Sequence, residues 1–132
     1  MERRSDCPIS FALDLFGDRW SLLVVRDLGL KGKRSFSELA ASDEGVATNV
    51  LSDRLARLEE AGIILKSRDP NDGRRYVYRL SEAGKDLLPV LVELIVWSAA
   101  HDDATAAPAS FVRAAKRDRE GMIRRLRAKL DD

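Results

Sequence analysis

The chain has 132 residues, of which 45% are hydrophobic and 34% are charged, which predicts one domain with a packed core and room for an appended helix. The 23 basic and 22 acidic residues nearly cancel, so net charge gives no argument for nucleic acid and only the local distribution can. One cysteine excludes an internal disulfide, and we expect neither a secretory leader nor a membrane-spanning run. A cytoplasmic protein without membrane contact is therefore expected.

Two helices are predicted at the start of the chain. Pro8 and Gly17 bound the first, over about residues 8–16, because proline favours the first helical position and glycine favours a helix end. Asp18 is a suitable N-cap for the second helix, over about residues 19–30. Apolar residues cover most of this second helix, so it should be buried on most sides.

A helix-turn-helix is predicted next. Ser35 and Glu38 have the spacing of a capping box, which starts a short helix over about residues 36–42. A turn containing Gly45 follows, and then a longer helix over about residues 47–61. Two helices joined by a tight, glycine-containing turn are typical of this motif.

The longer helix has the surface of a DNA recognition helix. One apolar stripe recurs at helical spacing and consists of Val50, Leu51, Leu55 and Leu58. The other face is compact and polar, which suits the DNA major groove, whereas a helix that meets only water usually carries Glu and Lys. Its candidate DNA contacts are Thr48, Asn49, Ser52, Asp53, Arg54 and Arg57. Asparagine can pair with adenine and aspartate can accept from cytosine, although Asp53 could instead only orient Arg54 or Arg57. Taken by itself, the stretch could also be an ordinary amphipathic surface helix.

A β-hairpin is predicted after this helix. Its strands cover residues 65–67 and 76–80, and the D-P-N-D-G run between them is a dense turn signal. Five basic residues against two acidic ones give a local positive excess, and a hairpin directly after a helix-turn-helix is a wing. The candidate phosphate or minor-groove contacts are Arg74 and Arg75 at its tip, and Lys33, Arg34 and Ser35 where the short helix begins. The alternative for the hairpin is a solvated surface feature.

The remainder of the chain is predicted to be helical. Residues 82–100 form a strongly apolar helix bent at Pro89, with more apolar positions than its own core needs. A small-residue linker and one basic helix, over about residues 108–130, follow. We therefore predict a domain at residues 1–100 and an appended linker and helix at residues 101–132.

Several ordered blocks resemble the HxlR-type regulators of bacteria, which are related to the MarR-type regulators. The blocks are C-P-I at 7–9, F-G-D-R-W-S-L-L-V-V-R-D-L at 16–28, S-F-S-E-L at 35–39, V-L-S-D-R-L-A-R-L-E-E-A-G-I at 50–63 and Y-R-L-S-E-A-G-K-D-L-L-P-V-L at 78–91. The resemblance implies a mainly α fold with a small β-hairpin, a winged helix-turn-helix with flanking dimerisation helices. It implies a homodimeric regulator, expected to be a repressor, that binds double-stranded DNA at an inverted-repeat operator and needs no cofactor.

The resemblance also assigns the dimer contacts to the first helix and the helix after the wing. The candidate residues are Ile9, Leu13, Leu91, Leu94, Ile95 and Trp97. Two features depart from the family pattern. Ala47 stands where a Ser or Thr often caps the recognition helix, so capping should fall to Thr48 or be weak. The wing sequence D-P-N-D-G-R-R is also similar to that of the MarR-type regulators, and nothing beyond His101 has a counterpart in the blocks.

Cys7 is the one thiol and a candidate redox sensor. A cysteine at a helix N-terminus, with Arg3 and Arg4 nearby, can react as the thiolate. Family members with a cysteine here include sensors of oxidants and electrophiles, so the resemblance allows an electrophile as effector. The alternatives are a small buried hydrophobe at this position and a non-covalent small-molecule effector near Trp20 and Trp97.

An enzyme is not expected. The glycines form no phosphate-binding cluster, no nucleophile and base are suggested by spacing, and one His and one Cys cannot build a metal site. The stronger competing function is a winged helix used as a protein-interaction module without DNA binding. The hairpin tip distinguishes the two, because an interaction module has no need for paired arginines beside a small polar helix face.

Overall fold

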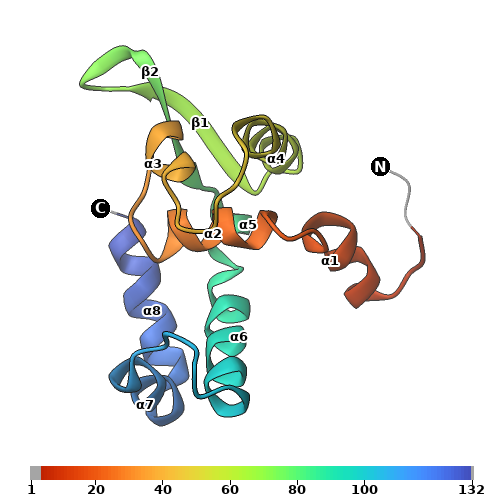
Figure 1. Cartoon of the computed structure of the whole chain (residues 1–132), viewed down its shortest axis with the longest axis vertical. Helices are drawn as coiled ribbons and strands as arrows, with labels where there is room; N and C mark the ends of the chain where they lie inside the picture. The colour runs from red at the N-terminus through yellow and green to blue at the C-terminus, as the bar shows by residue number, and fades with distance from the viewer. Residues whose placement is uncertain (1–3, 132) are drawn as a thin grey trace. The chain divides into compact units, whose positions relative to one another are not determined.

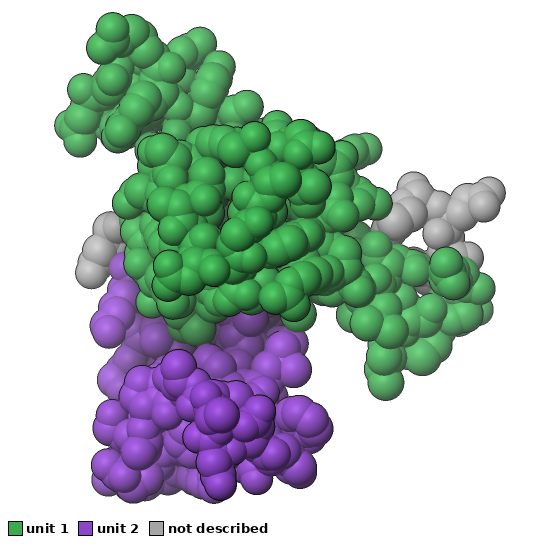
Figure 2. All heavy atoms as spheres, in the orientation of Figure 1, with its two compact units in different colours: residues 1–84 green, residues 85–132 purple. Residues whose placement is uncertain are grey.

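The computed structural model describes residues 4–131. The chain divides into two compact units, Met1–Gly84 and Lys85–Asp132, which Figure 2 shows in different colours. In the described residues the elements of Figure 1 are α1 (Pro8–Phe16), α2 (Ser21–Gly29), α3 (Phe36–Ala40), α4 (Thr48–Glu60), β1 (Ile64–Asp69), β2 (Asp72–Leu80), α5 (Glu82–Lys85), α6 (Leu88–His101), α7 (Ala109–Arg117) and α8 (Arg119–Leu130). None of these helices combines the length and the apolar character needed to cross a membrane.

The starts of the early helices follow the predicted capping residues. The Asp18 carboxylate accepts the backbone N–H of Trp20 at 2.9 Å and of Ser21 at 3.0 Å, which satisfies the open amides at the start of α2. At α3 the capping box is complete, because the Ser35 hydroxyl accepts the Glu38 N–H at 3.2 Å and the Glu38 carboxylate accepts the Ser35 N–H at 3.0 Å. The capping box predicted at Ser35 is confirmed. The prediction of Asp18 as the N-cap residue is wrong in position, because α2 begins at Ser21 with Trp20 as its N-cap residue, and Asp18 bonds these amides from the turn before the helix.

The helix α4 begins without a side-chain cap and ends at a glycine. Ala47 precedes its first turn, and no side chain accepts a hydrogen bond there, so the weak capping predicted from Ala47 is confirmed. At the other end Gly62 has a φ of +78°, the left-handed conformation that a residue without Cβ adopts at little cost. The chain thereby reverses from α4 into β1.

The hairpin is antiparallel and longer than predicted. Pairing runs from Ile64 opposite Leu80 out to Arg68 opposite Tyr76, since the polar residues beyond the apolar strand ends continue the ladder. A single bridge pairs Ser35 with Val77, so the residue before α3 lies along β2. At the base of the wing, three segments therefore lie side by side: the residues before α3, β2 and β1.

The core of the first unit lies where the helices α2, α3 and α4 meet the base of the hairpin. Its buried apolar residues are Val24, Val25, Leu28, Leu39, Leu51, Leu55, Leu58, Ile63, Ile64, Tyr78 and Leu80. The predicted stripe of α4 supplies three of them, while Val50 is half-buried. Because this stripe faces the core, the polar face of α4 points outward. The predicted winged helix-turn-helix is confirmed.

Two helix predictions in the second half of the chain are wrong. The helix expected over residues 82–100 is broken before Leu88, and Pro89 lies in the first turn of α6 instead of bending a continuous helix. Proline is tolerated there because the missing N–H would have no partner in any case. The helix expected over residues 108–130 is likewise two helices, α7 and α8, which meet at Asp118. The Asp118 carboxylate accepts the Gly121 N–H at 3.0 Å and caps α8.

The second unit has a small core of its own. Val92 of α6 is buried with Ala115 of α7 and Met122 of α8, and half-buried apolar residues surround them. Two ion pairs, Arg119 with Glu93 and Arg127 with Asp86, link α8 to α6 and to the turn before it. The contacts therefore group α6 with the C-terminal helices, whereas the predicted division at residue 100 separates them, and that division stays a prediction.

Candidate nucleic-acid interface

The outward face of α4 presents the predicted polar residues. The exposed candidates are Thr48, Asn49, Ser52, Asp53 and Arg57. Arg54 differs from them, because its side chain is only 21% exposed. The helix α4 lies beside the base of the hairpin, which projects from the same unit beside α3 (Figure 1). A surface of this kind offers short donors and acceptors to base edges and cations to phosphates.

Arg54 joins the recognition helix to the start of α2. Its Nε donates to the Asp18 carboxylate at 2.9 Å, and the Ser21 hydroxyl donates to the same carboxylate at 2.6 Å. Partial burial raises the pKa of Asp18, but the hydrogen bonds from Ser21, Arg54 and two backbone amides outweigh it and lower this pKa to about 2. Arg54 is therefore engaged by the fold, which distinguishes it from the exposed DNA candidates.

Asp53 lies between two arginines. Its carboxylate pairs with Arg54, and the Arg57 guanidinium is 3.8 Å away. A carboxylate so placed neutralises the face locally and holds Arg57 in position. This geometry fits the orienting role that the sequence left open for Asp53.

A charge network missed by the sequence reasoning holds the turn of the helix-turn-helix. Asp27 is 3% exposed and accepts hydrogen bonds from Arg26 at 2.8 Å and 3.0 Å. The same guanidinium donates to Glu44 at 3.3 Å, and Arg19 donates to Glu44 at 3.2 Å. The sequence did contain an indication of this network. Arg26 and Asp27 are adjacent charges in an otherwise apolar helix, and buried charges are normally paired.

The three phosphate candidates before α3 differ in their surroundings. Lys33 is 24% exposed, with its Nζ 3.8 Å from Asp27, and Ser35 is 5% exposed, with its hydroxyl used by the capping box. Arg34 is exposed, and its backbone oxygen accepts the Tyr78 N–H at 2.8 Å. Of these three residues, Arg34 is thus the best placed to reach a phosphate.

The two arginines at the tip of the wing also differ. The Arg75 guanidinium donates to Asp69 at 2.6 Å, which lowers the pKa of Asp69, and Asp69 in turn accepts the Asn71 N–H at 2.9 Å. Arg75 therefore stabilises the turn. Arg74 is 92% exposed and 3.2 Å from Asp72, so its guanidinium extends into solvent.

One face of the hairpin carries an aromatic residue between two cations. The Tyr76 ring is 42% exposed, with Lys66 Nζ 4.3 Å and Arg68 Cζ 5.0 Å from its centroid. Such contacts fix the two long side chains side by side. The sequence could have indicated this cluster of Tyr76 with two cations, because the pairing of the two strands places Arg68 opposite Tyr76.

The candidate dimer residues are mostly exposed apolar side chains. On α1, Ile9 is 72% and Leu13 is 60% exposed, and on α6, Leu94 is 46% and Trp97 is 62% exposed. Ile95 is half-buried, and Leu91 is only 5% exposed. Val90, which the sequence reasoning did not select, is 43% exposed and follows the same side of α6 at helical spacing.

Cys7 is exposed at the residue before α1. The alternative of a buried hydrophobe at this position is therefore wrong. Arg4 lies 3.9 Å from Asp14, and Arg3 lies outside the described residues.

Comparison with known proteins identifies the family. The profile of the HxlR-like helix-turn-helix family matches residues 15–106, which is most of the chain. The chain belongs to this family. The match includes the helix-turn-helix, the wing and α6, and ends before α7 begins.

Relatives in this family carry the description of helix-turn-helix transcriptional regulators. One from Mycobacterium tuberculosis is 41% identical over 86 residues, 65% of this chain and 53% of the relative. Another, YvaP of Bacillus subtilis, is 35% identical over 99 residues, 74% of this chain and 91% of the relative. The chain thus spans about half the length of the mycobacterial relative and most of the Bacillus one.

Solved structures of similar proteins have the same fold. The putative transcription factor PA1607 is 34% identical with a TM-score of 0.71, covering 80% of this chain and 72% of its own. The reduced form of the regulator YodB from Bacillus subtilis is 26% identical with a TM-score of 0.61, covering 76% and 99%. The HxlR-type resemblance is therefore confirmed. The family consists of transcriptional regulators rather than enzymes.

We predict that Asp18→Asn destabilises the chain in a pH-dependent way. The folded state holds the pKa of Asp18 at about 2, below its ordinary value of 3.8, so its stabilisation is fully present above pH 3.8 and is lost as pH falls through about 2. The variant should lose about 2 kcal/mol at pH 7, and about half of this difference should vanish by about pH 3.

Urea unfolding followed by tryptophan fluorescence at both pH values measures the effect. Asp43→Asn, at an exposed acidic position in the turn before α4, is the control and should stay within about 0.5 kcal/mol of the parent. An equal loss for Asp18→Asn at the two pH values would contradict the assigned role.

Proposed function

We propose that the chain is a homodimeric transcriptional repressor that binds double-stranded DNA at an inverted-repeat operator. The observation that carries this proposal is the exposed polar face of α4 beside a hairpin rich in exposed cations, both built on one core. Major-groove readout needs compact polar groups, and backbone contacts need cations that the fold leaves accessible.

The proposed docking separates DNA contacts from residues that position them. Asn49, Ser52 and Arg57 face base edges, and Thr48 faces the backbone at the start of α4. Arg34, Arg74 and the pair Lys66 and Arg68 face phosphates. Arg54 and Arg75 act through Asp18 and Asp69, since their guanidinium groups are already bonded within the chain.

The proposed dimer uses the exposed apolar side chains of α1 and α6. The contact residues are Ile9 and Leu13 of α1 with Val90, Leu94 and Trp97 of α6, and Val90 takes the place first given to Leu91. Large apolar side chains at this exposure are typical of an interface rather than of a free surface. A two-fold dimer presents two recognition helices to half-sites about one DNA turn apart.

We predict different effects of two substitutions on DNA binding. Asn49→Ala should weaken operator binding by roughly 1–3 kcal/mol and relax specificity at one base pair, because a base contact is lost. Arg74→Ala should weaken operator and random duplex alike and reduce the slope of affinity against salt. Fluorescence anisotropy with both duplexes measures this.

Arg113→Ala, which removes an exposed cation from α7, is the matched control and should bind like the parent. If both test variants bound both duplexes as the parent does, α4 and the wing would not dock on DNA. The alternative function, a protein-interaction module, would then be favoured.

We predict that Leu94→Glu abolishes the dimer. In a two-fold dimer each subunit would bury one such carboxylate in the apolar interface without a partner, which costs several kcal/mol. Sedimentation velocity should show a monomer with weakened operator binding. Ala128→Glu adds the same charge at an exposed position of α8 and should remain dimeric. A parent that is monomeric at micromolar concentration would refute the proposal.

The exposure of Cys7 supports a second, regulatory function. Solved relatives include YodB from Bacillus subtilis in quinone-bound and diamide-treated forms, and the redox regulator HypR in its oxidized form. We infer that Cys7 responds to electrophiles and oxidants through its thiolate. It adds to the ring of a quinone, or an oxidant such as diamide couples it with a small thiol or the partner's Cys7, and the diamide takes up the two electrons and two protons as the disulfide forms. Modification at the start of α1 would change the geometry of the proposed dimer.

We predict that Cys7→Ser removes this response. Treatment with diamide or a quinone should release the parent from operator DNA, while the variant should stay bound, because serine forms neither adduct. Mass spectrometry of the treated proteins gives the extent of modification. A variant released as readily as the parent would mean that Cys7 is not the sensor.

A further inference from the structure

The wing cluster, which consists of Tyr76, Lys66 and Arg68, is exposed and has a defined geometry. The centroid of the Tyr76 ring is 4.3 Å from Lys66 Nζ and 5.0 Å from Arg68 Cζ. One Arg68 N–H group donates to the Gly73 oxygen at 2.6 Å, and its other N–H groups have no acceptor in the described residues. The ring therefore holds two cations that can still bind an anion.

The wing cluster lies on the side of the hairpin that packs on the helices. Successive residues of a strand point to opposite sides, and residues paired across the ladder share a side. Ile64 is buried in the core at the base of β1, and Lys66 and Arg68 follow it at alternate positions. Tyr76 is paired with Arg68, so all three residues of the cluster continue the core-facing side of the hairpin beyond the core. Arg79 lies between two core residues of β2 and therefore points to the other side.

The hairpin leaves the charge of the wing cluster unbalanced. Its two acidic residues are used at the tip. Asp69 pairs with Arg75 at 2.6 Å. Asp72 pairs with Arg74 at 3.2 Å. In the part of the chain that the structure describes, no carboxylate forms an ion pair with either cation of the wing cluster. Two like charges held on one ring repel each other, and an anion bound between them removes this cost.

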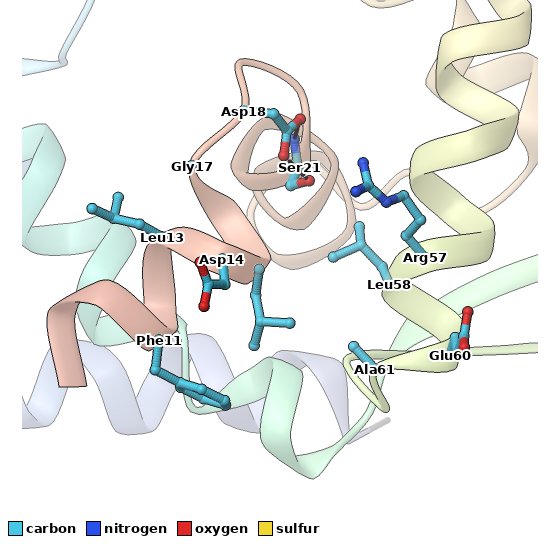
Figure 3. Close-up of a pocket in the computed structure, with 11 residues that line it drawn as sticks. Phe11, Leu13, Asp14, Gly17, Asp18, Ser21, Arg57, Leu58, Glu60 and Ala61 are labelled. Carbon is cyan, nitrogen blue, oxygen red and sulfur yellow. Dashed lines mark hydrogen bonds between the residues drawn. The ribbon is translucent and has the colours of Figure 1, made fainter. Parts of the chain in front are cut away.

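Arg57 of the recognition helix differs in this respect. Its guanidinium is 3.8 Å from the Asp53 carboxylate. Figure 3 shows that Arg57 also lines a cavity together with Asp18 and Glu60. Carboxylates around Arg57 repel an approaching phosphate, whereas the wing cluster presents only positive charge to it.

We propose that the wing cluster is a preformed clamp for phosphates of the DNA backbone, and that Tyr76 is its positioning residue. The electron-rich ring attracts both cations and keeps them side by side before DNA arrives. Long side chains lose rotamer freedom when a ligand orders them, so a pair that is already ordered binds at a lower entropic cost. The clamp rests on the proposed function for its ligand, because a duplex docked on α4 meets the side of the hairpin that packs on the helices.

Duplex DNA fits the clamp better than single-stranded nucleic acid does. Single strands bind through bases that stack on free aromatic faces, whereas the Tyr76 ring is already in contact with two cations. Phosphates recur at regular spacing along a duplex, which suits cations fixed on a rigid hairpin. Phosphate contacts do not read sequence, so the clamp strengthens binding of operator and random duplex alike.

Fluorescence anisotropy with operator and random duplex at several salt concentrations tests the clamp. Tyr76→Ile, which keeps a β-branched strand residue, should raise the Kd for both duplexes about five- to tenfold. It should leave the slope of log affinity against log salt unchanged, because both cations still meet phosphates. Tyr76→Phe keeps the ring and should bind within about twofold of the parent. Lys66→Ala should instead reduce the slope by about one for each subunit on the duplex.

Two controls separate positioning from other roles of the ring. Arg79→Ala removes an exposed cation from the other side of the same hairpin and should change neither the Kd nor the salt slope. Tyr76→Ile should add no further loss in a chain that already carries Lys66→Ala and Arg68→Ala, because the ring then has nothing to position. A further loss of about five- to tenfold in that chain would overturn the positioning role and assign Tyr76 to the stability of the wing.

Several outcomes would overturn the clamp. These are an unchanged Kd in Tyr76→Ile, and equal losses of affinity in Arg79→Ala and Lys66→Ala. Tighter binding of a single strand than of the duplex would mean that bases stack on the ring. Replacing chloride by inorganic phosphate at constant ionic strength should leave the Kd unchanged in the parent. A loss of DNA affinity in phosphate that disappears in Tyr76→Ile would make the free anion the ligand.

Failure of the proposed function is distinguishable from failure of the clamp. A parent that binds operator no more tightly than random duplex would refute operator recognition, while the effect of Tyr76→Ile on the random duplex would still decide the clamp. A parent that prefers operator and is unaffected by Tyr76→Ile would overturn the clamp and leave operator recognition standing.

Discussion

The recognition helix depends on the hydrogen bond from Arg54 to Asp18. This helix begins at Thr48, and the preceding residue, Ala47, provides no side-chain cap, so no local hydrogen bond from a side chain fixes its first turn. Its orientation is set instead by the apolar stripe below it and by the guanidinium of Arg54, which is bonded to the Asp18 carboxylate. The same carboxylate accepts backbone N–H groups at the start of α2. The Asp18 side chain thus bonds the backbone at the start of α2 and also fixes the orientation of α4 through Arg54. The cost of burying its charge is offset by a full set of donors.

The charged residues of the first unit fall into two groups with different physical roles. Arg19, Arg26 and Arg75 are paired with carboxylates that hold the helix-turn-helix turn or the wing tip. Arg74 and Arg57 keep most of their side chains in solvent, where a DNA phosphate could replace water and loosely held carboxylates. The near-zero net charge is therefore compatible with a nucleic-acid partner, because much of the cancellation occurs inside the fold.

Features set by local rules could be read from the sequence, and features set by distant partners could not. The capping box at Ser35 and the proline start of α1 depend on residues within one turn, so spacing alone predicted them. The helix break before Pro89 was missed because a proline after the first turn and a proline that starts a new helix look alike in sequence. The DNA candidates Arg54 and Ser35 could be placed on the right elements, but their engagement with other residues depends on packing that spacing does not encode.

The bridge between Ser35 and Val77 has a mechanical consequence. The segment entering α3 is hydrogen-bonded to β2, with the Tyr78 N–H 2.8 Å from the Arg34 oxygen, so the wing cannot swing about its base without breaking this register. The hairpin and the helix-turn-helix are therefore held together as one rigid body, with a fixed distance between Arg34 and the tip of the wing. In the proposed DNA complex, such a rigid arrangement would lose little conformational entropy on binding, and a duplex whose groove width does not match this distance would bind more weakly.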